Sequence, residues 1–356
     1  MARWPDEKAG TNCGDCGVNQ GHGRHRKLRM GSMLLFVLVA VLLFQTPAPA
    51  PSVEPPTEIA PSMFLFRYPP MPGRGPDGNT IIFNAPDGLI VVDTGRHTMV
   101  TDSILAFARE RKRPIVAIIN THWHLDHVSG NGRLKAEYPK ARVYTTTAVD
   151  RALAPGGFLA RNLDQVKTMP PPADQVRRDE VNIFVTTMDK GSDLRPDVPL
   201  TKSAAMRLAG KPLDVHVTDK AVSDADVWLF DKTSRVAVIG DLVTVPVPYF
   251  ESACPDKWKA ALDEVWGTPF EPAVPGHGRP MTRTQFDAYR RSFGEFVSCA
   301  RSGKDAAACG TAWADGIGSA LLDDDPARKR AVASGIEYYV GYLRSNGGKA
   351  PDCLAQ

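Results

Sequence analysis

The sequence THWHLDH, residues 121–127, carries the most informative pattern in this chain. It places four metal-binding side chains within six residues: His122, His124, Asp126 and His127. His122 and His124 are two positions apart, so on an extended loop their side chains point the same way. Imidazole with carboxylate is the ligand set of catalytic zinc, which keeps one coordination position for water. A chance cluster of surface histidines is the alternative, and it does not explain why Asp126 belongs to the pattern.

An apolar segment rich in Ile and Val, residues 114–120, precedes this motif and predicts a buried strand. The motif therefore lies on a loop at the carboxyl end of a strand, where open α/β sheets hold their sites. Other strands are predicted for residues 79–84, 89–93, 143–146, 213–217, 226–230 and 235–239.

Helices are predicted in the second half of the chain. Residues 257–266 form one, and Thr282 with Gln285 forms a capping box that begins another. A last helix carries Ile336, Tyr339, Val340 and Leu343 on one face. Residues 154–210, with three prolines at 170–172, look irregular, and so long a stretch in a compact domain predicts a functional lid.

Length and composition favour a soluble enzyme-sized domain. The chain has 356 residues, of which 43% are apolar and 23% charged, close to the averages for soluble globular proteins. The formal net charge is +3, and much of the basic excess lies in residues 22–29. Charge therefore gives no reason to expect a nucleic-acid partner.

The N-terminus predicts an export signal. Basic residues at 25–29 precede an apolar run at 33–44, and Ala48-Pro49-Ala50 follows. This order is typical of a cleaved signal peptide, whereas a membrane span needs about 20 apolar residues. We predict export, to the periplasm, with no stable membrane association after cleavage. An uncleaved N-terminal membrane anchor is the alternative, and Met30 or Met33 is an alternative start.

The cysteines fall into two groups. Cys13 and Cys16, with two nearby histidines, superficially suggest zinc, but the spacing is too short for a finger and the segment precedes the signal. Cys254, Cys299, Cys309 and Cys353 form an even number in a chain predicted to be exported, which favours disulfides. Three pairings are open, and we prefer Cys299 with Cys309 and Cys254 with Cys353. Four free thiols would follow if the chain is not exported.

The motif His-x-His-x-Asp-His resembles the central motif of the metallo-β-lactamase superfamily. Asp93-Thr94-Gly95, Gly240-Asp241 and Pro275-Gly276-His277-Gly278 occur in that family's order along the chain. The resemblance implies an α/β fold, an αββα four-layer sandwich with C-terminal helices. We expect an N-terminal extension and signal peptide in residues 1–50 and a Pro-rich linker in 51–62. The metallo-β-lactamase-like domain then spans 63–301, and a helical extension packed on it spans 302–356.

The resemblance also implies the metal ligands. It assigns His122 and His124 to a first metal, and Asp126, His127 and His277 to a second. Asp241 is a bridging or second-site ligand, and Asp93 supports the metal loop from behind. We expect one zinc, with two as the alternative.

The chain departs from the family pattern at one ligand. The family has a third first-site histidine in a stretch similar to residues 221–226 here, where Val222 occupies the ligand position. Valine has no lone pair, so affinity at the first site should fall. His216 is too far along its strand to substitute, and we interpret it as an ordinary strand residue. His97 lies just beyond Asp93, and we interpret it as a surface residue at the start of a helix, with a pocket role as the alternative.

These residues predict an exported zinc-dependent hydrolase for a small-molecule substrate. A zinc-bound hydroxide would attack an ester, lactone, amide, thioester or β-lactam carbonyl. Asp126, His122 and His124 are the expected catalytic residues, and the two histidines would orient water or carry protons. β-Lactamase activity is not favoured. The alternatives are a catalytically degraded protein of the same fold that binds a metal or ligand, and an iron-dependent redox member of the family.

Overall fold

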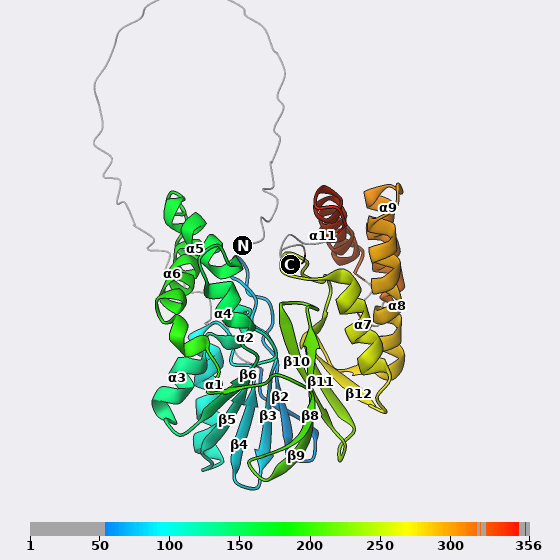
Figure 1. Ribbon diagram of the computed structural model, residues 1–356. Coiled ribbons are helices and arrows are strands. Elements are labelled where there is room, and N and C mark those ends of the chain that lie inside the picture. Colours follow the sequence, from blue (N-terminus) through cyan, green and yellow to red (C-terminus); the bar gives the residue numbers. More distant parts are fainter. Residues whose placement is uncertain (1–53, 319–320, 322–324, 349–352, 354–356) are drawn as a thin grey trace, which may run out of the picture. The chain divides into compact units, whose positions relative to one another are not determined.

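Two β-sheets packed face to face form the centre of the fold, and helices cover their outer faces (Figure 1). The computed structural model describes residues 54–318, 321, 325–348 and 353. The predicted signal peptide and the cysteines near the N-terminus lie outside these residues. Among the described helices, none has the length and apolar character needed to cross a bilayer.

The first sheet has the strand order β1-β2-β3-β4-β5-β6-β7. Its first four strands are antiparallel, and β4 to β7 are parallel. The strands are β1 Thr57–Ala60, β2 Met63–Phe66, β3 Thr80–Ala85, β4 Gly88–Val92, β5 Ile115–Ile119, β6 Arg142–Thr145 and β7 Val198–Pro199.

The second sheet has the order β13-β12-β11-β10-β9-β8, with only β11 and β12 parallel. The strands are β8 Ala204–Leu208, β9 Lys211–Asp219, β10 Ala225–Asp231, β11 Val236–Thr244, β12 Pro272–His277 and β13 Met281–Thr282. Each strand predicted from the sequence is present, with ends that differ by a few residues.

Helices in the first half of the chain begin with α1 Thr98–Glu110, which covers the first sheet together with α3. The others are α2 Leu125–Val128, α3 Asn131–Glu137, α4 Ala148–Leu153, α5 Phe158–Thr168, α6 Gln175–Asp189 and the 3-10 turn η1 Gly191–Leu194.

Helices in the second half cover the second sheet. They are α7 Pro255–Trp266, α8 Arg283–Ala300, α9 Ala306–Gly316 and α11 Pro326–Ser345. The predicted capping box is present at the start of α8, where Thr282 and Gln285 bond each other's backbone N–H groups. Ile336, Tyr339, Val340 and Leu343 are buried on one face of α11, as the spacing predicted.

Three apolar clusters give the fold its layers. Side chains such as Ile90 from the first sheet and Leu229 from the second fill the space between the sheets. A second cluster lies between the first sheet and α1, and a third packs α7, α8, α9 and α11 on the second sheet. Burial of apolar area on both faces of each sheet is the main stabilising term. The predicted αββα sandwich is confirmed.

Two sequence predictions about irregular segments were wrong. The linker predicted for residues 51–62 contains β1, an edge strand of four residues that pairs with β2. Prolines on both sides hid so short a strand. Residues 154–210 are mostly regular, because α5 and α6 form a helical hairpin there. These helices bury few residues (Leu159, Glu180 and Phe184), and the prolines at 170–172 between them led to the prediction of one irregular segment.

The structure contains the preferred disulfide pairing, Cys254 with Cys353 and Cys299 with Cys309. The first bond joins the start of α7 to the C-terminal segment, and the second joins α8 to α9. Cross-links of this kind stabilise a fold mainly by restricting the unfolded chain.

Candidate metal centre

The loop after β5 is held in place by the carboxylate of Asp93, which follows β4. Asp93 Oδ1 accepts from Thr121 N at 2.8 Å, and its Oδ2 accepts from Thr121 Oγ1 at 2.8 Å. The same Oδ2 lies 2.8 Å from Nδ1 of His127. Parallel pairing of β4 with β5 brings these two strand ends together. Asp93 therefore supports the loop from behind, as the sequence suggested.

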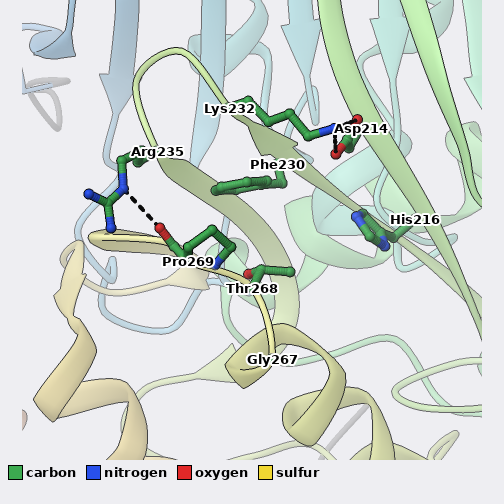
Figure 2. A pocket seen from close by; sticks show the side chains of 8 residues that line it. All are labelled: Asp214, His216, Phe230, Lys232, Arg235, Gly267, Thr268 and Pro269. Atoms are coloured by element: carbon green, nitrogen blue, oxygen red, sulfur yellow. Dashed lines mark hydrogen bonds and ion pairs between the residues drawn. The ribbon is translucent and has the colours of Figure 1, made fainter.

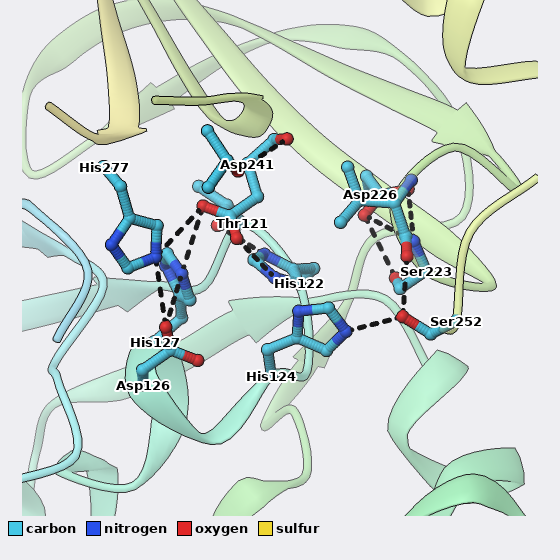
Figure 3. Close-up of polar contacts among 12 residues, drawn as sticks. Thr121, His122, His124, Asp126, His127, Ser223, Asp226, Asp241, Ser252 and His277 are labelled. Carbon is cyan, nitrogen blue, oxygen red and sulfur yellow. Dashed lines mark hydrogen bonds and ion pairs between the residues drawn. The ribbon is translucent and has the colours of Figure 1, made fainter. Parts of the chain in front are cut away.

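Donor atoms from three separate segments converge in front of this loop (Figure 3). His277 Nε2 lies 3.1 Å from Asp126 Oδ2 and 3.5 Å from Asp241 Oδ1. His127 Nε2 lies 3.3 Å from Asp241 Oδ1, and His122 Nε2 lies 3.7 Å from Asp241 Oδ2. The two sheets thus bring together residues that are as far apart in the sequence as His122 and His277.

Several of these buried atoms have no hydrogen-bond partner. Nε2 of His122, Nε2 of His127 and Oδ1 of Asp241 are all buried and unsatisfied. Leaving a buried polar group unpaired costs about 1–3 kcal/mol, so such groups rarely occur without a partner. His122, His127 and Asp241 form one group with metal-ligand spacing, and Asp126, His127 and His277 form another. The donor set fits a divalent cation such as zinc.

Outer hydrogen bonds set which nitrogen of each ring faces the centre. The Thr121 hydroxyl donates to Asp93, so it accepts from Nδ1 of His122 at 3.0 Å. The carboxylate of Asp93 likewise accepts from Nδ1 of His127. Both rings therefore carry a proton on Nδ1 and turn Nε2 towards the centre, where it would bind a metal, the usual arrangement around metal-bound histidine.

His124 is held differently. Ser252 Oγ donates to the carbonyl oxygen of Val222 at 2.9 Å, so it accepts from Nε2 of His124 at 2.7 Å. Nδ1 is then the nitrogen of His124 with a free lone pair. Its ring centroid lies 4.4 Å from that of His122, but His124 is in neither ligand group found among the described residues.

Val222 lies in a turn at the edge of this site. Its side chain belongs to the apolar cluster beneath the second sheet and is 1% exposed. The carboxylate of Asp226 accepts from the backbone N–H groups of Ala221, Val222 and Ser223, which fixes the turn. Ser252 was not among the residues predicted from the sequence, because a lone serine far from any motif carries no signal.

Electrostatics favour neutral histidines on one side of the site and ionised carboxylates on the other. Burial lowers the pKa of His122, and it lowers the pKa of His124 to about 4. Although burial raises the pKa of Asp126 and Asp241, neighbouring histidines outweigh it and hold both pKa values below their usual range. Metals bind neutral imidazole and ionised carboxylate, so these four side chains are in the form a cation requires. Burial lowers the pKa of His127 and His277, but neighbouring carboxylates outweigh it and raise both pKa values, so these two rings would release a proton when a cation binds.

His97 is not a surface residue. It is 5% exposed and bridges two carboxylates, with Nδ1 2.7 Å from Asp77 Oδ2 and Nε2 2.8 Å from Glu180 Oε1. Burial alone would lower its pKa, but the hydrogen bonds to Asp77 and Glu180 raise the pKa to about 9. His97 is therefore protonated at neutral pH and joins α6 to the loop before β3.

His216 takes no part in the centre, as expected. It stacks on Trp228 with ring centroids 3.7 Å apart, and its Nδ1 lies 3.1 Å from Glu264 Oε1. Figure 2 shows it on the wall of a surface pocket with Asp214, Phe230 and Lys232. This pocket contains none of the candidate metal ligands, so we do not assign it to the chemistry.

Comparison with known proteins supports the same family. The model of the metallo-beta-lactamase superfamily matches residues 73–277. A linear primary-alkylsulfatase from Pseudomonas sp. (strain ATCC 19151) is 26% identical over 220 residues, which are 56% of this chain and 41% of that protein. A hydroxyacylglutathione hydrolase from Synechococcus sp. (strain JA-2-3B'a(2-13)) is 47% identical over 57 residues, 16% of this chain and 22% of that one.

The chain thus spans less than half the length of these curated relatives. Among solved structures, a metallo-beta-lactamase family protein from Thermus thermophilus superposes with a TM-score of 0.55 at 18% identity. That match covers 82% of this chain and 95% of the other, and it shows the shared fold. With a family model that matches more than half of its residues, this chain belongs to the metallo-beta-lactamase superfamily.

Proposed function

We propose that this protein is an exported zinc-dependent hydrolase with one fully built metal site. Asp126, His127 and His277 would hold the zinc, with Asp241 beside them. The observation that carries the proposal is the set of buried, unpaired donor atoms that face one another, for which a cation is the simplest partner. His122 and His124 would bind a second metal weakly, since Val222 supplies no third imidazole.

Zinc, when bound, lowers the pKa of a coordinated water towards neutrality and stabilises negative charge on a carbonyl oxygen. The chain's own residues orient the reactants. Asp126 is ionised and 8% exposed, so its free oxygen can accept a hydrogen bond from an attacking water. His122 and His124 are neutral, so each can accept a proton or hold a water at its free nitrogen.

An ester, thioester, lactone, amide or β-lactam carbonyl is the proposed target. The names of the two relatives, an alkylsulfatase and a hydroxyacylglutathione hydrolase, support hydrolysis of ester-like bonds in small molecules. We do not favour β-lactams, because periplasmic β-lactamases with this ligand pattern usually keep the histidine that Val222 replaces. Trp123 and Tyr249 contact the His124 ring, and Phe158 packs on Trp123, so these aromatic side chains would contact an apolar part of the substrate.

Export is part of the proposal. The basic and apolar pattern of the N-terminus favours a cleaved signal, and the two disulfides suit an oxidising compartment such as the periplasm. A membrane anchor is the alternative if the signal is retained. Mass measurement of the secreted or periplasmic protein distinguishes cleavage after residue 50 from retention of the N-terminus.

The function is tested by metal analysis and hydrolysis assays on the same sample. We expect about one zinc per chain and turnover of p-nitrophenyl esters or lactones, both lost in Asp126→Ala. His216→Ala, which changes a histidine outside the centre, should keep both. A protein that takes up no zinc would support the non-catalytic alternative, and one that purifies with iron would support the redox alternative.

A further inference from the structure

A short loop forms hydrogen bonds with both segments that carry the proposed second-site ligands. We call residues 75–79, which precede β3, the clasp. Gly78 N donates to the carbonyl oxygen of Asp126 at 3.0 Å. The clasp also lies against the His127 ring, since a Cβ at position 78 would lie 2.4 Å from its Cε1 atom. Only glycine allows this close approach to a metal-ligand ring.

Asn79 holds the other segment. Its backbone N donates to Gly276 O at 2.6 Å, and its Nδ2 donates to Pro275 O at 2.8 Å and to Gly278 O at 2.9 Å. Three hydrogen bonds thus bracket His277 on both sides. Asn79 is 7% exposed, so water does not easily replace these bonds.

The two segments belong to different sheets. Asp126 and His127 follow β5 of the first sheet, whereas His277 ends β12 of the second. The 3.1 Å separation of His277 Nε2 from Asp126 Oδ2 therefore depends on how the sheet ends are held together. Gly78 and Asn79 are consecutive and bond one segment each, so the clasp links the two directly.

The clasp is itself anchored to helix α6. Asp77 Oδ1 accepts from the backbone N–H groups of Arg96 and His97, and Asp77 Oδ2 pairs with the His97 ring at 2.7 Å. The other nitrogen of that ring meets Glu180 Oε1 at 2.8 Å. Glu180 Oε2 accepts from Gly75 N at 2.9 Å. Glu180 is on α6, so the helical hairpin α5–α6 holds the clasp at two points.

We propose that Asn79 is a positioning residue that sets the approach of His277 to Asp126, and that Glu180 of α6 holds the clasp in place for it. The proposal rests on the metal site of the proposed function. It gives the α5–α6 hairpin a second role besides bordering the site, because movement of α6 would shift the clasp and with it the spacing of two ligands.

The test measures zinc affinity with Zn²⁺ alone, in competition with a chromogenic chelator. Asn79→Ala and Asn79→Asp both remove the two side-chain donors, and we expect each to raise the Kd for zinc about 10-fold or more, as loss of outer contacts to metal ligands typically does. Glu180→Ala, farther from the ligands, should raise it less. The visible spectrum of the Co²⁺-substituted protein should also change in the Asn79 variants.

Asp231→Ala is the matched control. Asp231 is also a buried side chain with several hydrogen bonds, to Lys211, Thr233 and Ser234, none of which is a candidate ligand. It should lower thermal stability without changing the Kd for zinc or the Co²⁺ spectrum. Wild-type Kd and spectrum in folded Asn79 and Glu180 variants, or an equal change in Asp231→Ala, would overturn the proposal.

Hydrogen exchange of the zinc-free protein separates this proposal from the proposed function. Asn79→Ala should speed amide exchange in residues 276–278 more than Asp231→Ala does, whether or not the wild-type protein takes up zinc. Absence of zinc binding by the wild type would refute the proposed function alone. Unchanged amide exchange at residues 276–278 in Asn79→Ala would refute the role proposed for the clasp.

Discussion

The two halves of the candidate centre differ in the donor atoms that they present to a metal. In the second-site half, Asp126, His127, Asp241 and His277 present convergent atoms from both sheets. In the first-site half, His124 bonds Ser252, and the expected third ligand position holds Val222. Both halves share one loop and similar burial. The difference teaches that a fold can preserve the residues of a metal loop in full while a side chain in a distant turn offers no donor atom to it.

The largest effect is expected from removing a proposed ligand of the second-site half. His277→Ala removes a ligand that no other described residue replaces, so zinc content should fall from about one per chain to near zero and hydrolysis with it. Elemental analysis after gel filtration measures this. The same measurement on His124→Ala should show that most of the zinc remains bound. If His124→Ala loses zinc as completely as His277→Ala, the two halves are not distinct.

The next largest effect is expected from supplying a third histidine to the first-site half. Val222→His supplies an imidazole at the position where the family has one, so zinc content should rise from about one to about two per chain and the hydrolytic rate should change. Val222→Leu, which alters size without adding a donor, is the control. A zinc content that stays at one in a folded Val222→His protein would contradict the assignment of Val222.

Ser252→Ala tests how the first-site half holds the ring of His124. Loss of the hydroxyl leaves the buried Nε2–H of His124 unpaired, which should lower the free energy of unfolding by about 1–3 kcal/mol. Nitrogen NMR should also show that His124 no longer populates one tautomer alone. Ser252→Thr keeps the hydroxyl and should resemble the wild type. An unchanged nitrogen spectrum in Ser252→Ala would show that this bond does not set the tautomer.

The smallest effect is expected at His97, which helps to hold the clasp beside the second-site half, and this effect depends on pH. The pKa of His97 is about 9 against an ordinary value of 6.5, so its contribution to stability is fully present below pH 6.5 and is lost as pH rises through 9. Burial raises the pKa of Glu180, but His97 and the Gly75 N–H outweigh it and lower that pKa from 4.5 to about 2. The contribution of Glu180 is therefore lost only in acid.

His97→Gln should accordingly lower Tm by several degrees at about pH 6 and by less at about pH 10. Thermal unfolding of both proteins at the two pH values measures the difference. Thr101→Val, at a buried position on α1, gives a pH-independent comparison. A loss of Tm that is equal at both pH values would show that the charge of His97 is not what stabilises the clasp.

Local sequence determined much of the fold. Apolar strands that end in Asp93 and Asn120 predicted where the loops of the site begin, because strand periodicity and turn chemistry are local properties. The spacing of Thr282 and Gln285 predicted the start of α8 for the same reason. The α5–α6 hairpin was not predicted, because the prolines at 170–172 between its two helices were interpreted as the middle of an irregular segment.

The candidate ligands were also named from the sequence, because their order matches a family pattern in which each motif ends a strand. The sequence alone could not show that His97 lies between Asp77 and Glu180, that Ser252 receives the proton of His124, or that Asn79 spans the two sheets. These contacts join residues from 20 to 199 positions apart. Only tertiary packing brings such residues within hydrogen-bond distance, because no local rule relates them.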